Sequence, residues 1–328
     1  VKALGAGESG VVVLNQTPFY AESGGQHGDS GSLTSSGGSF QVMETKKYGP
    51  HFGHEGRLDK GELKVGDTVN ARVEGPRRQA TALNHSATHL LHAALRSILG
   101  EHVTQKGSLV THERTRFDFS NPQPVKAEEI VAIEAMVNNE IRQNEEVVTR
   151  VMPIEEAKAA GAMALFGEKY DDEVRVLSMG DFSVEMCGGT HVKRTGDIGL
   201  FKIIAESGVA SGVRRIEAVT GDGALDHVLA LETTLGRAAT LLKTGADSLV
   251  SKIEQMAERV KVSEREVEAL KMKLATAAGG DLLDDVVDVS GVQCLVASLD
   301  GQDPKTLRDT MDRLKHRLSQ GVVVLATV

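Results

Sequence analysis

The sequence predicts an α+β protein built from four consecutive parts, and three observations lead to this fold class. Short apolar runs separated by glycine clusters fill residues 1–80. Strand-like and helix-like segments follow one another without strict alternation over 81–222, which is typical of an α+β domain. A proline-free stretch rich in Ala, Leu, Glu, Lys and Arg covers 223–278, before a strand–helix–strand pattern in 279–328. We therefore expect a small β-barrel, an α+β domain, a helical hairpin and part of a C-terminal α/β domain.

Residues 1–80 are expected to form the small β-barrel. Several short strands with regular turn signals are typical of that architecture. Dense glycines could also cradle a phosphate through backbone N–H groups, but simple β-turns explain most of them better, and the sequence contains no P-loop. The expected strands are 11–14, 40–43 and 68–73, with turns at Gly24-Gly25, Gly37-Gly38 and Gly66-Asp67.

The second part, residues 81–222, contains the elements of the expected α+β domain. A helix begins near His85, because apolar residues recur at helical spacing from Leu90 to Leu99. Another helix is expected over 127–144, where two glutamates occupy the first turn and favour the helix dipole. The remaining expected elements are a short helix at 153–160 and strands at 103–110, 116–119, 174–177, 182–186, 200–205 and 214–219.

The last two parts differ from the first two in composition. One helical stripe runs from Leu225 to Leu242 and a second from Leu249 to Leu274, with a turn at Gly245 between them. Two stripes joined by a short break predict an antiparallel hairpin, with a coiled-coil dimer as the less favoured alternative. Beyond it, strands at 292–299 and 322–328 flank a helix at 304–318, which is a βαβ pattern.

Two motifs about a hundred residues apart carry the candidate metal ligands. His85 and His89 stand four residues apart in HSATH on the first helix, so they share a face of that helix. Cys187 and His191 flank Gly188-Gly189 in CGGTH, where the glycines allow a tight turn. Three imidazole nitrogens and one thiolate form a ligand set that suits zinc. We therefore expect one Zn²⁺ site made of His85, His89, Cys187 and His191.

Either motif alone is weak evidence. A lone HxxxH on an amphipathic helix is more often an ordinary pair of histidines, and a lone CxxxH is weaker still. Their combination favours a metal site, and their separation is unlike a zinc finger, so the ligands must come from separate elements of one domain. The sequence leaves open whether three ligands bind and keep a position for water or substrate, or four bind and close the site.

Longer stretches around these motifs resemble a known family. HSATHLLHAALRSILGEHVTQKGSLV with RFDFS, and SVEMCGGTHVKRTGDIGLFKI with SGVRRIEAVTG, resemble the editing domain of the alanyl-tRNA synthetases. TPFYAESGGQHGDSG is similar to the glycine-rich segment that precedes that domain in the family. The resemblance covers residues 1–220 strongly and the rest moderately. It implies a zinc-containing editing domain that hydrolyses the ester of tRNA(Ala) mischarged with serine or glycine.

The resemblance also implies roles for two further residues. Thr88 lies on the ligand face of the helix, where its hydroxyl would contact the serine side chain; a packed threonine that bonds back to a helix carbonyl is the alternative. Gln105 matches a family position implicated in editing, where a neutral amide would orient water or the ester carbonyl. Otherwise it is a surface glutamine. Editing needs no ATP, which belongs to the aminoacylation half that we expect this chain to lack.

Composition limits the expected partners and location. The net charge of −9 argues against general attraction to nucleic acid, so tRNA would meet local pairs such as Arg77-Arg78, Lys193-Arg194 and Arg214-Arg215. No apolar run is long enough to span a membrane, and no signal peptide is visible. Sparse cysteine fits a reducing cytoplasm. The family's C-terminal domain assists oligomerisation, so we expect a homo-oligomer formed through that region.

Two other functions remain open at this point. A free-standing editing hydrolase of the AlaX type, acting in trans, has the same domains. A non-catalytic, zinc-stabilised tRNA-binding module is the alternative from another class. The chain begins with Val1 and ends in the apolar run GVVVLATV, so we expect a piece of a longer protein. That expectation favours the synthetase over the free-standing hydrolase.

Overall fold

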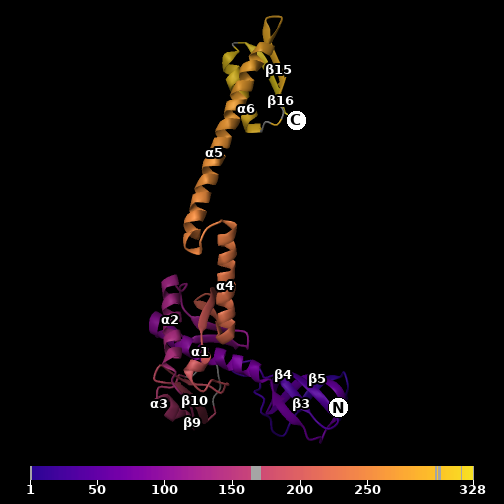
Figure 1. Ribbon diagram of the computed structural model, residues 1–328, viewed down its shortest axis with the longest axis vertical. Coiled ribbons are helices and arrows are strands. Elements are labelled where there is room, and N and C mark those ends of the chain that lie inside the picture. Colours follow the sequence, from indigo (N-terminus) through magenta and orange to yellow (C-terminus); the bar gives the residue numbers. More distant parts are fainter. Residues whose placement is uncertain (1, 164–170, 300, 302–303, 319, 328) are drawn as a thin grey trace. The chain divides into compact units, whose positions relative to one another are not determined.

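A computed structural model of the chain describes residues 2–163, 171–299, 301, 304–318 and 320–327 (Figure 1). They fall into two compact units, Val1–Leu231 and Glu232–Val328. Helices and mostly antiparallel sheets occur together in the described residues, so the predicted α+β class is confirmed.

The first unit begins with a six-stranded antiparallel sheet. The strands are β1 (Ala3–Gly5), β2 (Ser9–Val13), β3 (Gly31–Thr34), β4 (Gly38–Tyr48), β5 (His51–Lys64) and β6 (Asn70–Val73). Their order is β1-β5-β4-β3-β6, and β2 pairs with β5 beside β1. The inner face buries a small apolar core formed by Phe19, Leu33, Phe40, Val42, Leu58 and Leu63.

This sheet differs from the closed barrel that the sequence suggests. Within the described residues, no ladder joins β6 to β1, so the sheet stays open. The sheet stays open because of how the long strand β5 pairs. One edge of β5 pairs with β4, and the other edge pairs with β2 along one part of its length and with β1 along another. Two register shifts in the β4–β5 ladder bend the pair over the core. The core is thus covered by curvature, without closure.

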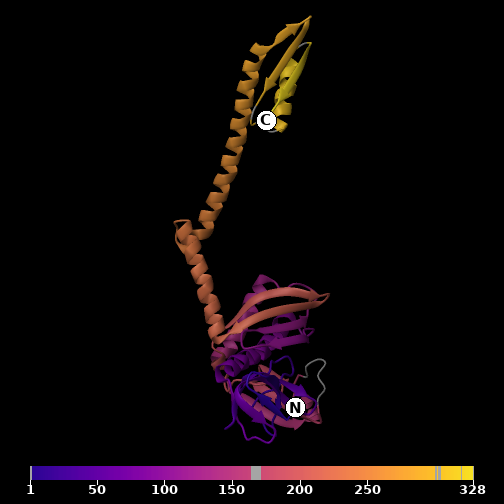
Figure 2. The same ribbon diagram turned by 90° about the vertical axis from the view of Figure 1, so that its right-hand side faces the viewer.

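A long central helix connects this sheet to the next layer. Helix α1 (Gly75–Leu99) has Pro76 in its first turn and is capped by Gly100, whose φ of 120° suits glycine. It packs against α2 (Ala127–Gln143) and against a four-stranded antiparallel sheet. That sheet has the order β12 (Phe201–Ala210), β13 (Val213–Thr220), β8 (Thr115–Ser120), β7 (Gln105–Val110), and its long β12–β13 hairpin is visible in Figure 2.

A third sheet brings the cysteine motif to the central helix. It contains β9 (Val147–Pro153), β10 (Glu173–Met179) and β11 (Ser183–Met186) in the order β11-β10-β9, with the short helix α3 (Ile154–Ala159) beside it. Strand β11 contacts α1 and ends one residue before Cys187. The CGGTH turn therefore starts where the strand reaches the helix that carries HSATH.

The second unit contains most of the long helical region and a small α/β part. Helix α4 (Gly221–Leu241) is followed by α5 (Leu249–Asp281), then by β14 (Val287–Val289), β15 (Val292–Ser298), α6 (Pro304–Arg317) and β16 (Gly321–Ala326). Strands β15 and β16 pair in parallel, which confirms the predicted βαβ pattern. The last residue of the expected final strand, Val328, lies outside the described residues.

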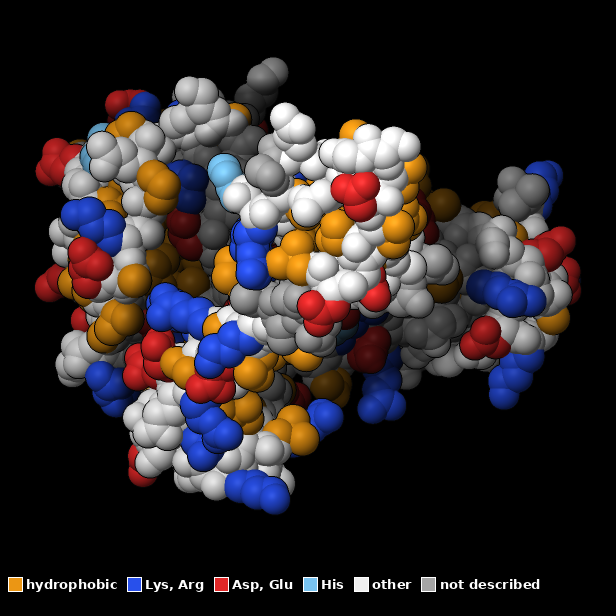
Figure 3. All heavy atoms as spheres, turned by 90° about the horizontal axis from the view of Figure 1, so that it is seen from above, with side chains coloured by type: hydrophobic (Ala, Val, Ile, Leu, Met, Phe, Trp, Pro, Cys, Tyr) orange, Lys and Arg blue, Asp and Glu red, His pale blue; other side chains and the backbone are white. Residues whose placement is uncertain are grey.

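The two predicted helices of the hairpin exist, but their apolar stripes stay exposed. Leu235 is 46% exposed on α4, and Ile253 and Val260 are 50% and 56% exposed on α5. An antiparallel pair would bury such side chains against each other, so the structure does not show that packing. Exposed hydrophobic side chains also lie among interspersed basic and acidic ones on the face shown in Figure 3.

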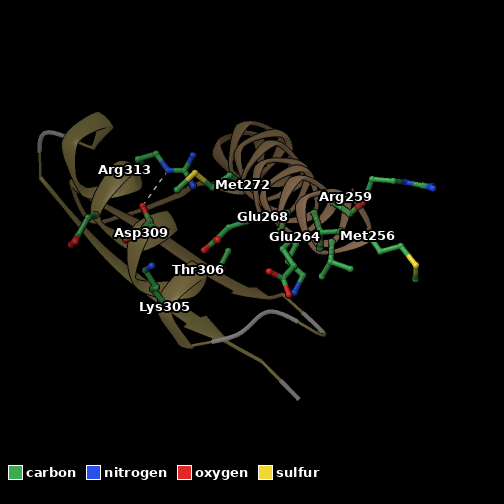
Figure 4. A pocket seen from close by; sticks show the side chains of 14 residues that line it. Met256, Arg259, Glu264, Glu268, Met272, Lys305, Thr306, Asp309 and Arg313 are labelled. Carbon is green, nitrogen blue, oxygen red and sulfur yellow. Dashed lines mark hydrogen bonds between the residues drawn. The ribbon is translucent and has the colours of Figure 1, made fainter. Parts of the chain in front are cut away.

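A cavity of about 1090 Å³ lies between α5 and α6 in the second unit (Figure 4). Basic and acidic side chains line it together with a few apolar ones, and the residues that form its wall include no histidine or cysteine. Its chemistry is therefore unrelated to the motifs singled out above. The lining includes Met256, Arg259, Glu264, Glu268, Met272, Lys305, Asp309 and Arg313.

Candidate metal centre

The two predicted ligand pairs meet in the interior of the first unit. One ligand atom from each of His85, His89, Cys187 and His191 lies within 4.8 Å of the others. The Sγ atom of Cys187 is 3.3 Å from Nε2 of His191 and 3.6 Å from Nε2 of His85. These separations match neighbouring ligands around one ion, since zinc–nitrogen and zinc–sulfur bonds are about 2.0–2.3 Å long. The expected convergence of the helix and the distant turn is confirmed.

Local structure explains how each pair is presented. His85 and His89 lie one turn apart on the same face of α1, and both are buried. The turn after β11 needs glycine at position 189 because it runs close to the helix. A Cβ atom on Gly189 would lie 2.1 Å from Cε1 of His85, whereas one on Gly188 would meet nothing within 4 Å. Only the second glycine is therefore demanded by packing.

Each of the three imidazoles has its Nδ1 atom held by another side chain. Nδ1 of His85 is 2.7 Å from Oε1 of Gln26, and Nδ1 of His89 is 2.6 Å from Oε2 of Glu185. Nδ1 of His191 is 3.2 Å from Oγ of Ser86. Oε1 of Gln26 and the carboxylate of Glu185 can only accept, so they place a hydrogen on Nδ1 of His85 and His89 and leave Nε2 for a metal. The Ser86 hydroxyl can accept from Nδ1 of His191 in the same way, which would leave Nε2 of that ring for the metal too.

One nitrogen of the cluster has no hydrogen-bond partner among the described protein atoms. Nε2 of His89 is buried and makes no hydrogen bond in the described residues. An unpaired buried nitrogen is costly unless something binds it, and a metal ion would supply that bond. The donor set, the oriented Nε2 atoms and the orphaned nitrogen together fit a metal ion held by these four residues.

The charges of the cluster also favour a cation. Burial alone would raise the pKa of the Cys187 thiol, but the imidazoles of His85 and His89 outweigh it and lower that pKa well below the usual range. The sulfur is therefore present as thiolate, the form that binds metal. Burial, together with the neighbouring His85, lowers the pKa of His191 to about 3, so this imidazole is neutral and able to donate its lone pair.

Glu185 is the buried counter-charge of the site. Burial would raise its pKa, but His89 and His92 hold the carboxylate ionised and lower the pKa to about 2. Burial likewise lowers the pKa of His89, yet the carboxylate of Glu185 and the thiolate of Cys187 raise it to about 10. Both oxygens of Glu185 are used, because the second is 3.0 Å from Nδ1 of His92. His92 thus contacts the carboxylate that holds His89, and it is not one of the four residues of the ligand cluster.

The CGGTH turn is fixed by partners from two other elements. The guanidinium of Arg175, on β10, donates to the carbonyl of Gly189 at 2.6 Å and to that of Cys187 at 3.3 Å. The N–H of Val192 donates to Oγ of Ser86 at 3.1 Å. The turn therefore cannot drift from α1 without breaking several hydrogen bonds.

A cavity of about 360 Å³ adjoins the cluster. His85 and Cys187 form part of its wall, so a molecule inside it would reach the metal ligands. The rest of the wall comes from the loop after β2, from the first and third sheets and from the CGGTH turn, namely Tyr20, Ala21, Ser23, Gly24, Lys47, Phe52, Asp171, Glu173, Val174, Arg175, Gly188 and Gly189. The cavity is thus polar, with both signs of charge at its border.

The structure places the two other expected site residues differently. Thr88 is buried, and its hydroxyl donates to the carbonyl of Asn84 at 2.8 Å and lies 2.6 Å from Oγ1 of Thr115. This is the packed arrangement that the sequence left open as an alternative. Gln105 is partly buried at the start of β7, beside a register shift, and it is not among the residues that line the cavity.

Four of the five arginines in the three basic pairs are engaged within the chain. Arg78 pairs with Asp29, and Arg194 with the side chain and carbonyl of Asn144. The second arginine pair lies on β13 and forms two-pronged ion pairs: Arg214 with Glu206, with nitrogen–oxygen distances of 2.6 Å, and Arg215 with Asp118, at 2.6 and 2.8 Å. These four guanidinium groups hold elements together within the chain, and contact between the basic pairs and RNA stays a prediction.

Sequence reasoning missed the residues that support the ligands. Ser86 stands inside HSATH, and Glu185 stands two residues before Cys187 on a strand, where alternate residues share a face. The closeness of Ser86 and Glu185 to the ligands along the sequence could have predicted that these two residues support the metal site. Gln26 gave no such signal, because it is 59 residues from the histidine that it contacts.

Comparison with known proteins agrees with this site. A family model described as the class II (A) tRNA synthetases matches residues 1–77, and one described as the threonyl and alanyl tRNA synthetase second additional domain matches 174–217. The chain is 58% identical over 328 residues to an alanine–tRNA ligase of Halorhodospira halophila (strain DSM 244 / SL1), covering 100% of this chain and 38% of that protein. The second match includes Cys187 and His191.

Two further relatives give the same result. An alanine–tRNA ligase of Stenotrophomonas maltophilia (strain K279a) is 57% identical over 327 residues, covering 99% of this chain and 37% of that protein. One of Haemophilus influenzae (strain PittGG) is 54% identical over 328 residues, covering 100% of this chain and 38% of that protein. The chain therefore spans about 38% of the length of the curated relatives that it matches.

Proposed function

Because the chain belongs to the alanine–tRNA ligase family, we propose that it carries the editing activity of such a ligase, the hydrolysis of the ester in Ser-tRNA(Ala). The observation that carries this proposal is the buried cluster of three imidazoles and one thiolate beside a polar cavity. Aminoacylation, with its need for ATP, is assigned to segments of the relatives that this chain does not span.

We assign zinc as the metal, held by His85, His89, Cys187 and His191. Nitrogen and sulfur donors at these separations suit it better than magnesium or calcium, which prefer oxygen ligands. When bound, zinc would supply a positive centre that can hold the amino or carbonyl group of an aminoacyl ester. The protein's own contribution is to orient three Nε2 atoms and to keep the cysteine as thiolate.

The need for such a site follows from the energetics of amino-acid selection. A pocket that accepts alanine rejects serine only weakly, because one small group contributes about 1–3 kcal/mol. A second, hydrolytic site can require the serine hydroxyl, since alanine would leave a buried polar group unpaired at a cost of about 1–3 kcal/mol. Glycine lacks the hydroxyl, so clearance of Gly-tRNA(Ala) needs a different basis from recognition of the hydroxyl.

The proposal gives Thr88 and Gln105 the roles of recognising the serine hydroxyl and orienting water. For Thr88 this requires its hydroxyl to accept a bond from the substrate while it still donates to Asn84. Comparing Thr88→Val with Thr115→Val separates recognition from packing, because each removes one partner of the same hydroxyl pair. Loss of serine specificity only in Thr88→Val supports the contact; equal losses assign both threonines to packing.

Deacylation measurements test the main proposal. Ser-tRNA(Ala) and Ala-tRNA(Ala) are incubated with the wild-type chain and with Cys187→Ala, and bound metal is measured in the same samples. We expect the wild type to release serine faster than alanine, and Cys187→Ala to lose both its metal and most of this activity. Serine release that is undiminished in the metal-depleted variant would refute the assignment.

Two other functions give different results in this assay. A non-catalytic, zinc-stabilised tRNA-binding module would bind the tRNA without accelerating deacylation. A free-standing hydrolase of the AlaX type would deacylate tRNA in trans and is distinguished by the gene, which would encode no aminoacylation domain. Identity over the full chain to ligases of larger size favours the ligase.

The proposal extends to partners and location. We propose tRNA(Ala) mischarged with serine or glycine as the partner, and a cytoplasmic location, where the reducing environment keeps a ligand cysteine as thiolate. No helix in the described part of the chain is long and apolar enough to cross a membrane. A homo-oligomer through the C-terminal region is supported by exposed apolar side chains on α5, including Val260, Val267 and Leu270, and sedimentation analysis tests it.

A further inference from the structure

One residue of the metal centre comes from the first sheet region of the chain. Gln26 lies in the glycine-rich loop between β2 and β3, yet its side chain is completely buried beside the cluster. Its amide contacts both halves of the ligand set, namely His85 on α1 and Thr190 in the CGGTH turn. The metal centre is therefore completed by a segment outside the two ligand motifs.

The polarity of the amide matches its neighbours. Oε1 of Gln26 accepts from the N–H of Thr190 at 2.9 Å and lies 2.7 Å from Nδ1 of His85. Nε2 of Gln26 donates to Oγ1 of Thr190 at 2.8 Å. Because Oε1 accepts two hydrogens, it keeps the hydrogen of His85 on Nδ1 and leaves Nε2 of that ring for the metal.

Backbone hydrogen bonds attach the loop that carries Gln26 to strand β7 of the four-stranded sheet. The N–H of Val110 donates to the carbonyl of Gly25 at 2.8 Å, and the N–H of His27 donates to the carbonyl of Val110 at 3.0 Å. Gly25 has a φ of +83°, and a Cβ atom there would lie 2.4 Å from the carbonyl oxygen of Ser108. Loop 23–27 thus docks along the edge of β7 in a conformation that needs glycine.

We propose that Gln26 is a positioning residue for the metal ligand His85, so that metal binding and docking of loop 23–27 on β7 stabilise each other. If the docked loop favours metal binding, thermodynamic reciprocity requires the bound metal to favour the docked loop by the same factor. The proposal concerns metal affinity and loop protection, so it is independent of the deacylation activity proposed above.

Metal affinity tests the first half of the proposal. Competition between the full chain and a zinc chelator is measured for the wild type, Gln26→Leu and Gln26→Glu. Leucine keeps similar bulk and removes every hydrogen bond, so we expect zinc affinity to fall about 10–100-fold. Glutamate still accepts from His85 and from the N–H of Thr190, so it should recover most of the loss. Gln41→Leu, on β4, is the matched control and should bind zinc like the wild type.

Spectra of Co²⁺-loaded protein distinguish positioning from general destabilisation. Loss of the Gln26 amide frees the His85 ring to turn, so the visible absorption bands of bound Co²⁺ should shift in Gln26→Leu and stay unchanged in Gln26→Glu and Gln41→Leu. A merely structural role would lower stability without moving these bands. Wild-type affinity together with a wild-type spectrum in Gln26→Leu would overturn the proposal.

Hydrogen exchange tests the reciprocal half on the wild-type chain. The amides of His27 and Val110 should exchange more slowly with Zn²⁺ bound than without it, by a factor similar to the loss of affinity in Gln26→Leu. That zinc-dependent protection should disappear in Gln26→Leu and persist in Gln26→Glu. Should Gln26→Leu fail to fold, the wild-type comparison still decides: equal exchange with and without zinc refutes the coupling.

Discussion

At the residue scale, Glu185 controls the protonation of the ligand His89. Its carboxylate bridges His89 and His92, and it is the first favourable charge that raises the pKa of His89 to about 10. The metal-free imidazole of His89 is therefore protonated at pH 7. Zinc binding must remove that proton, so zinc affinity should rise with pH until the pH passes the pKa of about 10.

Replacing Glu185 by Gln should change this proton release. Without the carboxylate, burial is opposed only by the thiolate of Cys187, so the pKa of His89 falls and less of the ring is protonated before zinc binds. Titration calorimetry in buffers of different ionisation enthalpy should show fewer protons released per zinc than in the wild type. Glu134→Gln, whose carboxylate binds Lys202 and the N–H of Ile203, is the control and should release as many protons as the wild type. Unchanged release in Glu185→Gln would contradict this assignment.

The two glycines of CGGTH provide a second residue-scale prediction. In Gly189→Ala the new Cβ would lie 2.1 Å from Cε1 of His85 and 2.8 Å from Oε1 of Gln26, so the turn must move away from α1. We expect zinc affinity to fall by at least about tenfold, measured by chelator competition. Gly188→Ala introduces the same methyl group where nothing lies within 4 Å and should bind zinc like the wild type. Equal affinities for the two variants would exclude the close approach seen here.

At the element scale, strand β13 is anchored through its arginines. Arg215 forms a two-pronged ion pair with Asp118 on β8, and both side chains are mostly buried. Arg215→Met would leave that carboxylate without its partner, so we expect the free energy of unfolding to fall by about 1–3 kcal/mol in urea titrations. Arg114, which is 51% exposed and meets Glu217 at 3.4 Å, is the matched control. Arg114→Met should cost only about 0–1 kcal/mol.

Elements also differ in how far they could be predicted. Helix α2 was expected at 127–144 and is found at Ala127–Gln143, because its apolar spacing and first-turn glutamates act within the helix itself. Strand β5 was missed, since glycine and charged residues interrupt its alternation. Its stability comes from partners on both edges, which no local pattern reports. The prediction of a closed barrel was wrong for the same reason. Whether the sheet closes depends on the strands that pair with β5, and local sequence patterns do not report those partners.

At the scale of the whole molecule, the metal centre belongs entirely to the first unit. All four ligands and the three side chains that hold their Nδ1 atoms lie within Val1–Leu231. A chain that ends at Thr244, after α4, should therefore bind zinc with the affinity of the full chain, measured by the same chelator competition. A large loss of affinity in the shortened chain would mean that Glu232–Val328 stabilises the centre.

The sequence by itself determined the chemistry of this protein. Ligand types, their spacing and the helix that carries HSATH follow from local patterns, because helical periodicity and glycine turns act over a few residues. Only the tertiary structure decided which side chains orient the ligands. Gln26 and Glu185 reach the imidazoles because β7 receives the glycine-rich loop and β11 runs beside α1. The contact of Gln26 depends on packing between segments 59 residues apart, and residue spacing carries no record of it, whereas the place of Glu185 on the strand before Cys187 is a local hint.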